Sequence, residues 1–178
     1  MRFMAYIPLL LAAGCGSAGG DENKAAPKAA GLADGQWELA TEVTAFRTVD
    51  QGQPAIDTPQ GTRTTESVCV PAGAQAPASL FAGPGYDCRY DNYYARNGRV
   101  NVTLQCTREG LAGSIPMSVS GDFADGTLEY DRQIRTVLAG DGDVELTMRV
   151  TGRRTGECVP EAEAGNASNG NAGNGQAG

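Results

Sequence analysis

Apolar and polar side chains alternate along most of the chain between residues 35 and 158, and this period of two is the feature that most constrains the fold. Successive side chains of a β-strand point to opposite faces of a sheet, so the alternation predicts half-buried strands. The runs from Trp37 to Ala45 and from Thr62 to Val70 are clear examples, with Trp37 as a core anchor. Apart from a helical turn expected around residues 78–81, no stretch has the 3.6-residue repeat of a helix. The sequence predicts an all-β domain.

The hairpin between Asp87 and Gln105 can be tested for register, because a slip of one residue turns every side chain to the other face. A two-residue turn at Asn97 and Gly98 mixes apolar and polar side chains on each face. A three-residue loop over residues 96–98 instead brings the apolar faces of the two strands into register. It opposes Tyr94 to Val100, Asn92 to Val102, Tyr90 to Leu104 and Cys88 to Cys106. Opposed cysteines lie within disulfide range, so we expect a Cys88–Cys106 disulfide and, by remainder among three connectivities, Cys69–Cys158.

Two further hairpins follow from the same reasoning. A two-residue turn at Asp125 and Gly126 opposes Phe123 to Leu128, Gly121 to Tyr130 and Met117 to Ile134. A three-residue loop over residues 140–142 opposes Leu138 to Val144, Thr136 to Leu146 and Ile134 to Met148, and places Glu129 opposite Arg153. Three consecutive hairpins make a meander. The expected fold is an antiparallel sheet of six to eight strands, curled into a half-barrel or a small barrel and held by two disulfides.

The N-terminus predicts export. Met1 and Arg2 precede an apolar run from Phe3 to Ala13, which is too short to span a bilayer and typical of a signal peptide. The run ends at Leu-Ala-Ala-Gly-Cys, which resembles the bacterial lipobox, with Cys15 as the lipidated residue. The alternative is an ordinary secretory signal in which Cys15 is discarded. An even number of cysteines beyond Cys15 agrees with an oxidising compartment, and zinc is the weaker reading because no CxxC pair occurs.

Composition divides the chain into four segments. Residues 1–14 are the expected signal peptide, and residues 15–34 form a lipid-anchored linker that is poor in large apolar side chains. Residues 35–160 form the β domain, and the Gly, Asn and Ala of residues 161–178 predict a disordered tail.

Charge and composition also exclude classes of function. The chain has no histidine, which removes Ser-His-Asp and Cys-His catalysis and histidine-ligated metals. Its formal net charge is −7, the wrong sign for nucleic-acid binding. We therefore expect no enzyme activity, no catalytic residues, no cofactor, no metal site and no nucleic-acid partner.

Several short motifs occur in a characteristic order around the four cysteines. They are Gly35-Gln36-Trp37-Glu38, Cys69-Val70-Pro71, Asp87-Cys88, Leu104-Gln105-Cys106, Ser120-Gly121-Asp122-Phe123 and Arg153-Arg154-Thr155-Gly156-Glu157-Cys158. In this order the chain resembles the domain of unknown function 3617 family of small exported proteobacterial proteins, over about residues 35–158. The resemblance implies export and a shared fold, and it supplies no catalytic residues.

The densest aromatic and basic cluster is the candidate ligand site. Its members are Tyr86, Arg89, Tyr93, Arg96 and Arg99, which could stack on and hydrogen-bond a glycan or an aromatic ligand. The alternative is strand packing and a solvated edge, with Tyr90 and Tyr94 in the core and Tyr93 on the surface. Loop aspartates at positions 122, 125, 141 and 143 could offer oxygens to calcium, but Asp-Gly is also an ordinary turn dipeptide.

The sequence therefore predicts a non-enzymatic envelope lipoprotein, facing the periplasm and located in the outer membrane because Gly16 and not Asp follows Cys15. Its expected partners are the membrane, through the acyl anchor, and an unknown envelope protein or small ligand. The alternative is a lysozyme-inhibitor-like protein or a small-ligand-binding β-barrel.

Overall fold

The computed structural model describes residues 31–140 and 142–158, and this part of the chain consists of strands with one short helix. The elements are β1 (Gly35–Thr48), β2 (Arg63–Val70), α1 (Ser79–Ala82), β3 (Asp87–Arg96), β4 (Arg99–Arg108), β5 (Leu111–Ala124), β6 (Thr127–Arg135), β7 (Val137–Leu138) and β8 (Val144–Gly156). The all-β prediction is confirmed. The expected signal peptide, the expected lipidation of Cys15, most of the expected linker and the C-terminal tail fall outside the described residues.

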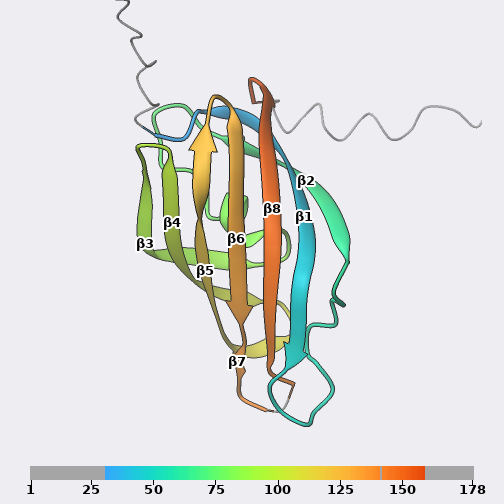
Figure 1. The fold of residues 1–178 in the computed structure, drawn as a ribbon. Coiled ribbons are helices and arrows are strands. Elements are labelled where there is room, and N and C mark those ends of the chain that lie inside the picture. Colours follow the sequence, from blue (N-terminus) through green and yellow to red (C-terminus); the bar gives the residue numbers. More distant parts are fainter. Residues whose placement is uncertain (1–30, 141, 159–178) are drawn as a thin grey trace, which may run out of the picture.

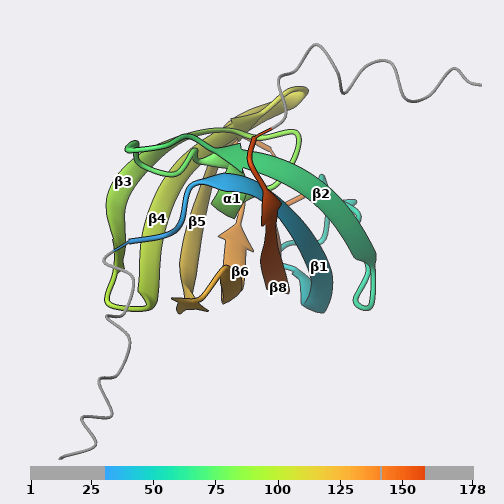
Figure 2. The same cartoon turned by 90° about the horizontal axis from the view of Figure 1, so that it is seen from above.

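One antiparallel sheet contains all the strands, in the order β2-β1-β8-β6-β5-β4-β3, with β7 beside β5. β2 and β3 stand at the two ends of this order and do not pair with each other. The sheet is curled, and because its two end strands do not pair, it remains an open half-barrel (Figures 1 and 2). The chain follows a meander from β3 to β6, and β8 then lies between β6 and β1.

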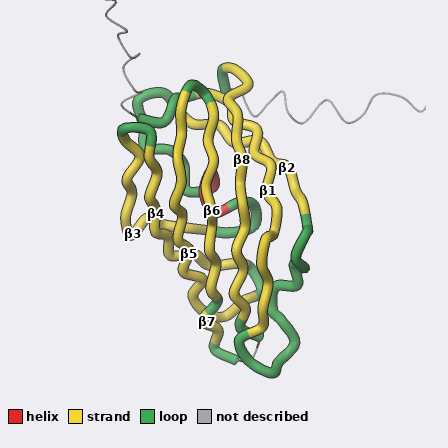
Figure 3. The backbone as a smooth tube through the Cα atoms, in the orientation of Figure 1, coloured by secondary structure: helices red, strands yellow, loops and turns green. Residues whose placement is uncertain are grey.

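The hydrophobic core lies on the concave face, because alternate side chains of each strand point there. Trp37, the predicted anchor, is fully buried, and its indole Nε1 donates to the Ala33 carbonyl at 3.0 Å. The loop between β2 and β3, which carries α1, runs across this face (Figure 3) and buries Leu80 and Phe81 against it. A half-barrel of this size thus fills its interior with its own loop.

Two disulfides fasten the sheet at both ends of that loop. Cys69 is bonded to Cys158, with their Cα atoms 5.3 Å apart, and Cys88 is bonded to Cys106, with their Cα atoms 4.1 Å apart. The Cys88–Cys106 bond that the hairpin register predicted is confirmed, and so is the Cys69–Cys158 bond that followed by remainder. Cys69 precedes the loop by two residues, and Cys88 follows it in β3.

The β5–β6 hairpin has the predicted register, with Phe123 opposite Leu128, Gly121 opposite Tyr130 and Met117 opposite Ile134. The predicted register of the last hairpin is wrong, because Ile134 pairs with Leu146 and Glu129 pairs with Thr151. β6 ends at Arg135, and the following strand β7 leaves it to pair with Gly113 and Ser114 of β5. The connection to β8 is therefore longer than a three-residue loop.

The β3–β4 hairpin was predicted correctly at its cysteine end and wrongly at its turn. Cys88 faces Cys106 and Tyr90 faces Leu104, but the turn has two residues, Asn97 and Gly98, both with positive φ. The extra residue is a bulge between Tyr90 and Asn92.

That bulge exchanges the faces of two tyrosines relative to the prediction. Tyr93 turns inward, and its ring packs edge-on against Phe81 at a centroid distance of 6.2 Å. Tyr94 turns outward and is 43% exposed. The expectation of Tyr94 in the core and Tyr93 on the surface is therefore wrong.

No helix in residues 31–140 and 142–158 is long and apolar enough to cross a membrane.

Candidate functional site

The outer face of the sheet is hollowed by a groove of 580 Å³. Outward-facing side chains of four adjacent strands line it: Thr103 and Gln105 of β4, Pro116 and Ser118 of β5, Gln133 and Arg135 of β6, and Glu145 and Thr147 of β8. Asp91, the bulge residue of β3, adds to the lining. The volume is within the range of small-ligand sites, roughly 300 to 1,000 Å³. We call this feature the outer groove.

Hydroxyl and amide groups supply the uncharged hydrogen-bonding groups of the outer groove. Ser114 donates its hydroxyl to the Gln105 side-chain oxygen at 2.9 Å. This bond orients the amide, so its NH₂ group remains available as a donor. Gln133 lies two strands away on the same face and is exposed. The side-chain amides of Gln105 and Gln133 can donate and accept hydrogen bonds, and neither carries a charge.

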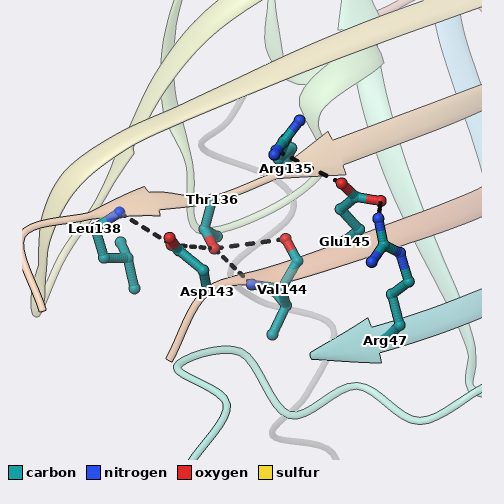
Figure 4. A network of polar contacts seen from close by, with 7 residues as sticks. All are labelled: Arg47, Arg135, Thr136, Leu138, Asp143, Val144 and Glu145. Atoms are coloured by element: carbon teal, nitrogen blue, oxygen red, sulfur yellow. Dashed lines mark hydrogen bonds and ion pairs between the residues drawn. The ribbon is translucent and has the colours of Figure 1, made fainter. Parts of the chain in front are cut away.

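The charged residues at the end of the groove largely neutralise one another (Figure 4). The Glu145 carboxylate forms ion pairs with Arg47 and with Arg135, the latter with a separation of 3.5 Å between nitrogen and oxygen. Both arginine side chains are exposed, so these pairs stabilise the fold little. With Asp91, which also lines the groove, two acidic and two basic side chains balance in charge. The groove therefore carries little net charge and favours an uncharged polar ligand.

The first residues of β1 and the last residues of β8 lie at one end of the sheet, and the outer groove lies toward the other end. Gln36 at the start of β1 pairs with Gly156 at the end of β8, whereas Arg47 at the far end of β1 pairs with Glu145 in the groove. β1 has 14 residues, which at the rise of an extended strand is about 45 Å. The start of β1 and the start of β8, where Glu145 lines the groove, therefore lie at opposite ends of the sheet, as the course of the two strands shows (Figure 1).

A second unusual feature lies inside the half-barrel, where β6 places an arginine on the concave face. Arg132 is only 4% exposed. Its Nη1 donates to the Phe81 carbonyl and its Nη2 contacts the Met148 sulfur, both at 3.1 Å, while its Nε has no partner. A buried guanidinium is costly unless it is paired and hydrogen-bonded. No carboxylate among the described residues forms an ion pair with it.

The groups near Arg132 have perturbed acidities. Burial raises the pKa of the half-buried Glu66 carboxyl of β2, and the Arg132 guanidinium opposes this rise. Burial also raises the pKa of the phenols of Tyr130, Tyr90 and Tyr93. These phenols are therefore neutral donors at physiological pH.

The aromatic and basic residues singled out in the sequence lie in separate places. Tyr93 packs in the interior, and Tyr86 contacts Arg108, whose guanidinium lies 5.2 Å from the ring centroid. Arg96 and Arg99 are exposed and opposite each other beside the β3–β4 turn. Arg89 lines a smaller hollow that shares Gln105 with the outer groove.

Of the loop aspartates, Asp143 has structural partners. Asp143 accepts hydrogen bonds from the Thr136 hydroxyl at 2.9 Å and from the Leu138 amide at 3.0 Å (Figure 4). Asp122 is exposed in β5, and Asp125 occupies a positive-φ turn position, while residue 141 is not described. Within the described ranges, no three cysteine or acidic side chains are grouped so that they could hold a metal.

Sequence reasoning missed both features described above. The residues of the outer groove are ordinary polar side chains on four strands, and only a correct register for all four would bring them together. Arg132 did carry a signal: it stands between Tyr130 and Ile134 at a spacing of two, so an arginine occupies an inward position of a predicted strand.

Comparison with known proteins matches the chain to one family. The family described as "Protein of unknown function (DUF3617)" matches residues 32–158. No curated protein and no solved structure matches the chain.

Proposed function

The chain belongs to the DUF3617 family, and from this premise we propose that it is a non-enzymatic lipoprotein of the bacterial envelope that binds an uncharged, hydroxyl-rich ligand in the outer groove. The observation that carries the proposal is the lining of the groove by amides and hydroxyls around an internally neutralised carboxylate. A carbohydrate chain has the matching chemistry, because its hydroxyls both donate and accept hydrogen bonds.

The position of the groove supports an anchored binding module. In our proposal Cys15 carries the acyl group, and the linker after it enters the domain near Gly35. The groove lies at the other end of β1. A ligand in the aqueous space beyond the membrane surface can therefore reach it while the anchor stays inserted.

Two observations support a binding role over a catalytic one. The sequence has no histidine to act as a base near neutral pH. The Glu145 carboxylate of the groove already forms ion pairs with two arginines.

Calorimetric titration of the full chain with two neutral oligosaccharides, chitotetraose and cellotetraose, tests the proposal. We expect saturable binding of at least one. Gln133→Ala and Gln105→Ala should each weaken it about fivefold, the equivalent of one net hydrogen bond of about 1 kcal/mol.

The matched control is Gln60→Ala, which removes the same amide from an exposed loop position outside the groove. It should leave the affinity unchanged. If neither sugar binds, or if all three variants bind as the wild type does, the proposed site is wrong.

A further inference from the structure

The loop between β2 and β3 covers the concave face of the half-barrel and has little structure of its own. Residues 71–86 contain only the four-residue helix α1, and Gly73, Gly83 and Gly85 have positive φ. Leu80, Phe81 and Ala82 nevertheless are fully buried against the sheet. We call residues 71–86 the plug, because α1 lies within the curve of the sheet (Figure 2) and its side chains are part of the buried core.

The plug is held to the sheet by its backbone carbonyls. Tyr90 donates to the Ala76 carbonyl at 2.8 Å, Tyr130 to the Leu80 carbonyl at 2.6 Å and Arg132 to the Phe81 carbonyl at 3.1 Å. All three donors are long side chains of the sheet. Each bond can break without disturbing a strand, because none belongs to the ladder of the sheet.

Arg132 is the weakly satisfied member of this set. Its Nη1 bonds a neutral carbonyl and its Nη2 a thioether sulfur, while its Nε bonds nothing. Charge-assisted bonds from arginine to a carboxylate or phosphate are about twice as strong as bonds to neutral groups and are frequently bidentate. An anionic group arriving at this position would be a better partner than the Phe81 carbonyl.

The two disulfides fix the residues on either side of the plug to the sheet. Cys69 is bonded to Cys158, next to the end of β8, and Cys88 is bonded to Cys106 in β4. The two residues stand just before and just after the plug. Both ends of the plug are therefore covalently fixed to the sheet. The segment between them is held by packing, by the three carbonyl bonds and, at its last residue, by a hydrogen bond from Arg108 to the Tyr86 hydroxyl.

We propose that the concave face beneath the plug is a binding site for an acyl chain with an anionic head group. The chain would take the apolar surface that Leu80, Phe81 and Ala82 cover, and the head group would replace the Phe81 carbonyl on Arg132. This site is independent of the outer groove, which lies on the opposite face of the sheet.

The test uses the full-length Cys15→Ser chain, which carries no acyl group to compete for the site. Calorimetry with dodecanoate, dodecyl phosphate and dodecanol compares one apolar chain with three head groups. We expect one-to-one binding of the anionic probes and at least tenfold weaker binding of dodecanol. Binding of dodecyl phosphate alone would assign the site to phosphate head groups, and binding of both anions would assign it to their shared chemistry.

Two variants should change the affinity in opposite directions. Arg132→Met keeps an apolar side chain of similar length and should weaken the binding of dodecanoate about tenfold. Tyr130→Phe removes the bond to the Leu80 carbonyl, loosens the plug and should strengthen binding about fivefold, because less free energy is spent on opening.

Arg149→Met is the matched control, because Arg149 lies on the neighbouring strand β8 but on the outer face, where it pairs with Asp131. It should bind as the wild type does. If Arg132→Met does not fold, Tyr130→Phe alone decides. The proposal is overturned if neither the wild type nor Tyr130→Phe binds the anionic probes, if Tyr130→Phe does not strengthen binding, or if the folded Arg132 and Arg149 variants bind equally.

Discussion

Glu66 and Asp50 are two carboxylic acids whose surroundings shift their pKa values in opposite directions. Backbone amides of Asp143, Gly142 and Gly52 donate to the Asp50 carboxylate and hold its pKa below the usual value. Glu66 is half-buried on β2, and burial raises its pKa despite the attraction of Arg132. Asp50 therefore favours the folded state when it is ionised, and Glu66 favours it when it is protonated.

The first prediction concerns the pH dependence of stability. Because the pKa of Glu66 is raised in the folded state, its contribution is fully present below the usual value of 4.5 and is lost as the pH rises through the folded value. Glu66→Gln cannot ionise and does not undergo this loss. The difference in unfolding free energy between the variant and the wild type should therefore shift in favour of the variant from pH 4 to pH 7. Urea denaturation at both pH values measures the difference.

Glu109→Gln, at an exposed turn, is the control for that experiment. Its unfolding free energy should follow the wild-type profile. If Glu66→Gln also parallels the wild type at both pH values, Glu66 does not experience the interior described above.

At the scale of elements, the hairpins show how far the sequence determines the register. The turn at Asp125 and Gly126 was predicted because both flanking strands alternate without interruption. The bulge after Tyr90 was not predicted. A three-residue turn without a bulge and a two-residue turn with a bulge in β3 both place Cys88 opposite Cys106, so the cysteines do not distinguish them. Only the packing of Tyr93 on Phe81 distinguishes the two arrangements, and that contact depends on tertiary structure.

The end of β6 was unpredictable for a related reason. Thr136 and Leu138 continue the apolar and polar alternation of β6, so the pattern favoured a longer hairpin. In the structure Thr136 is buried and bonded to Asp143, and β7 pairs with β5 instead. Pairing with a distant strand therefore outweighed the local pattern.

The β5–β6 hairpin supplies the second prediction. A Cβ added at Gly121 would lie 2.1 Å from the Glu129 carbonyl oxygen and 2.5 Å from the Tyr130 Cα, so backbone would have to move. Gly121→Ala should destabilise the domain by about 1 to 3 kcal/mol. Gly140→Ala meets nothing within 4 Å and should change stability by less than about 0.5 kcal/mol.

Chemical denaturation of the two glycine variants measures both effects. Equal stabilities would show that β5 and β6 do not approach each other as closely at Gly121 as described.

At the scale of the whole molecule, covalent bonds and a loop together replace the second layer that a sheet usually requires. An open half-barrel exposes its concave face unless something covers it, and here the plug does so between two disulfides. This arrangement leaves the outer face free for the groove. One small domain thus has a fixed frame, a loop that covers its concave face and a polar groove on its outer face.

The third prediction concerns that frame. Cys69 and Cys158 are separated by 89 residues and Cys88 and Cys106 by 18, so loop entropy assigns the two bonds about 4.5 and 3 kcal/mol of stability. The Cys69→Ala, Cys158→Ala double variant should therefore lose more unfolding free energy than the Cys88→Ala, Cys106→Ala double variant. Denaturation of both under identical conditions checks the order, and equal losses would contradict it.

We propose that this half-barrel is oxidised outside the cytoplasm and held at a membrane through Cys15. Mass-spectrometric peptide mapping of the native protein, taken from membrane fractions without reduction, tests it most directly. We expect Cys69 linked to Cys158, Cys88 linked to Cys106 and a diacylglyceryl group on Cys15, with the Cys15→Ser chain missing from the membrane. Free thiols at the four inner positions, or an unmodified Cys15 in a protein that stays in the membrane fraction, would contradict the account.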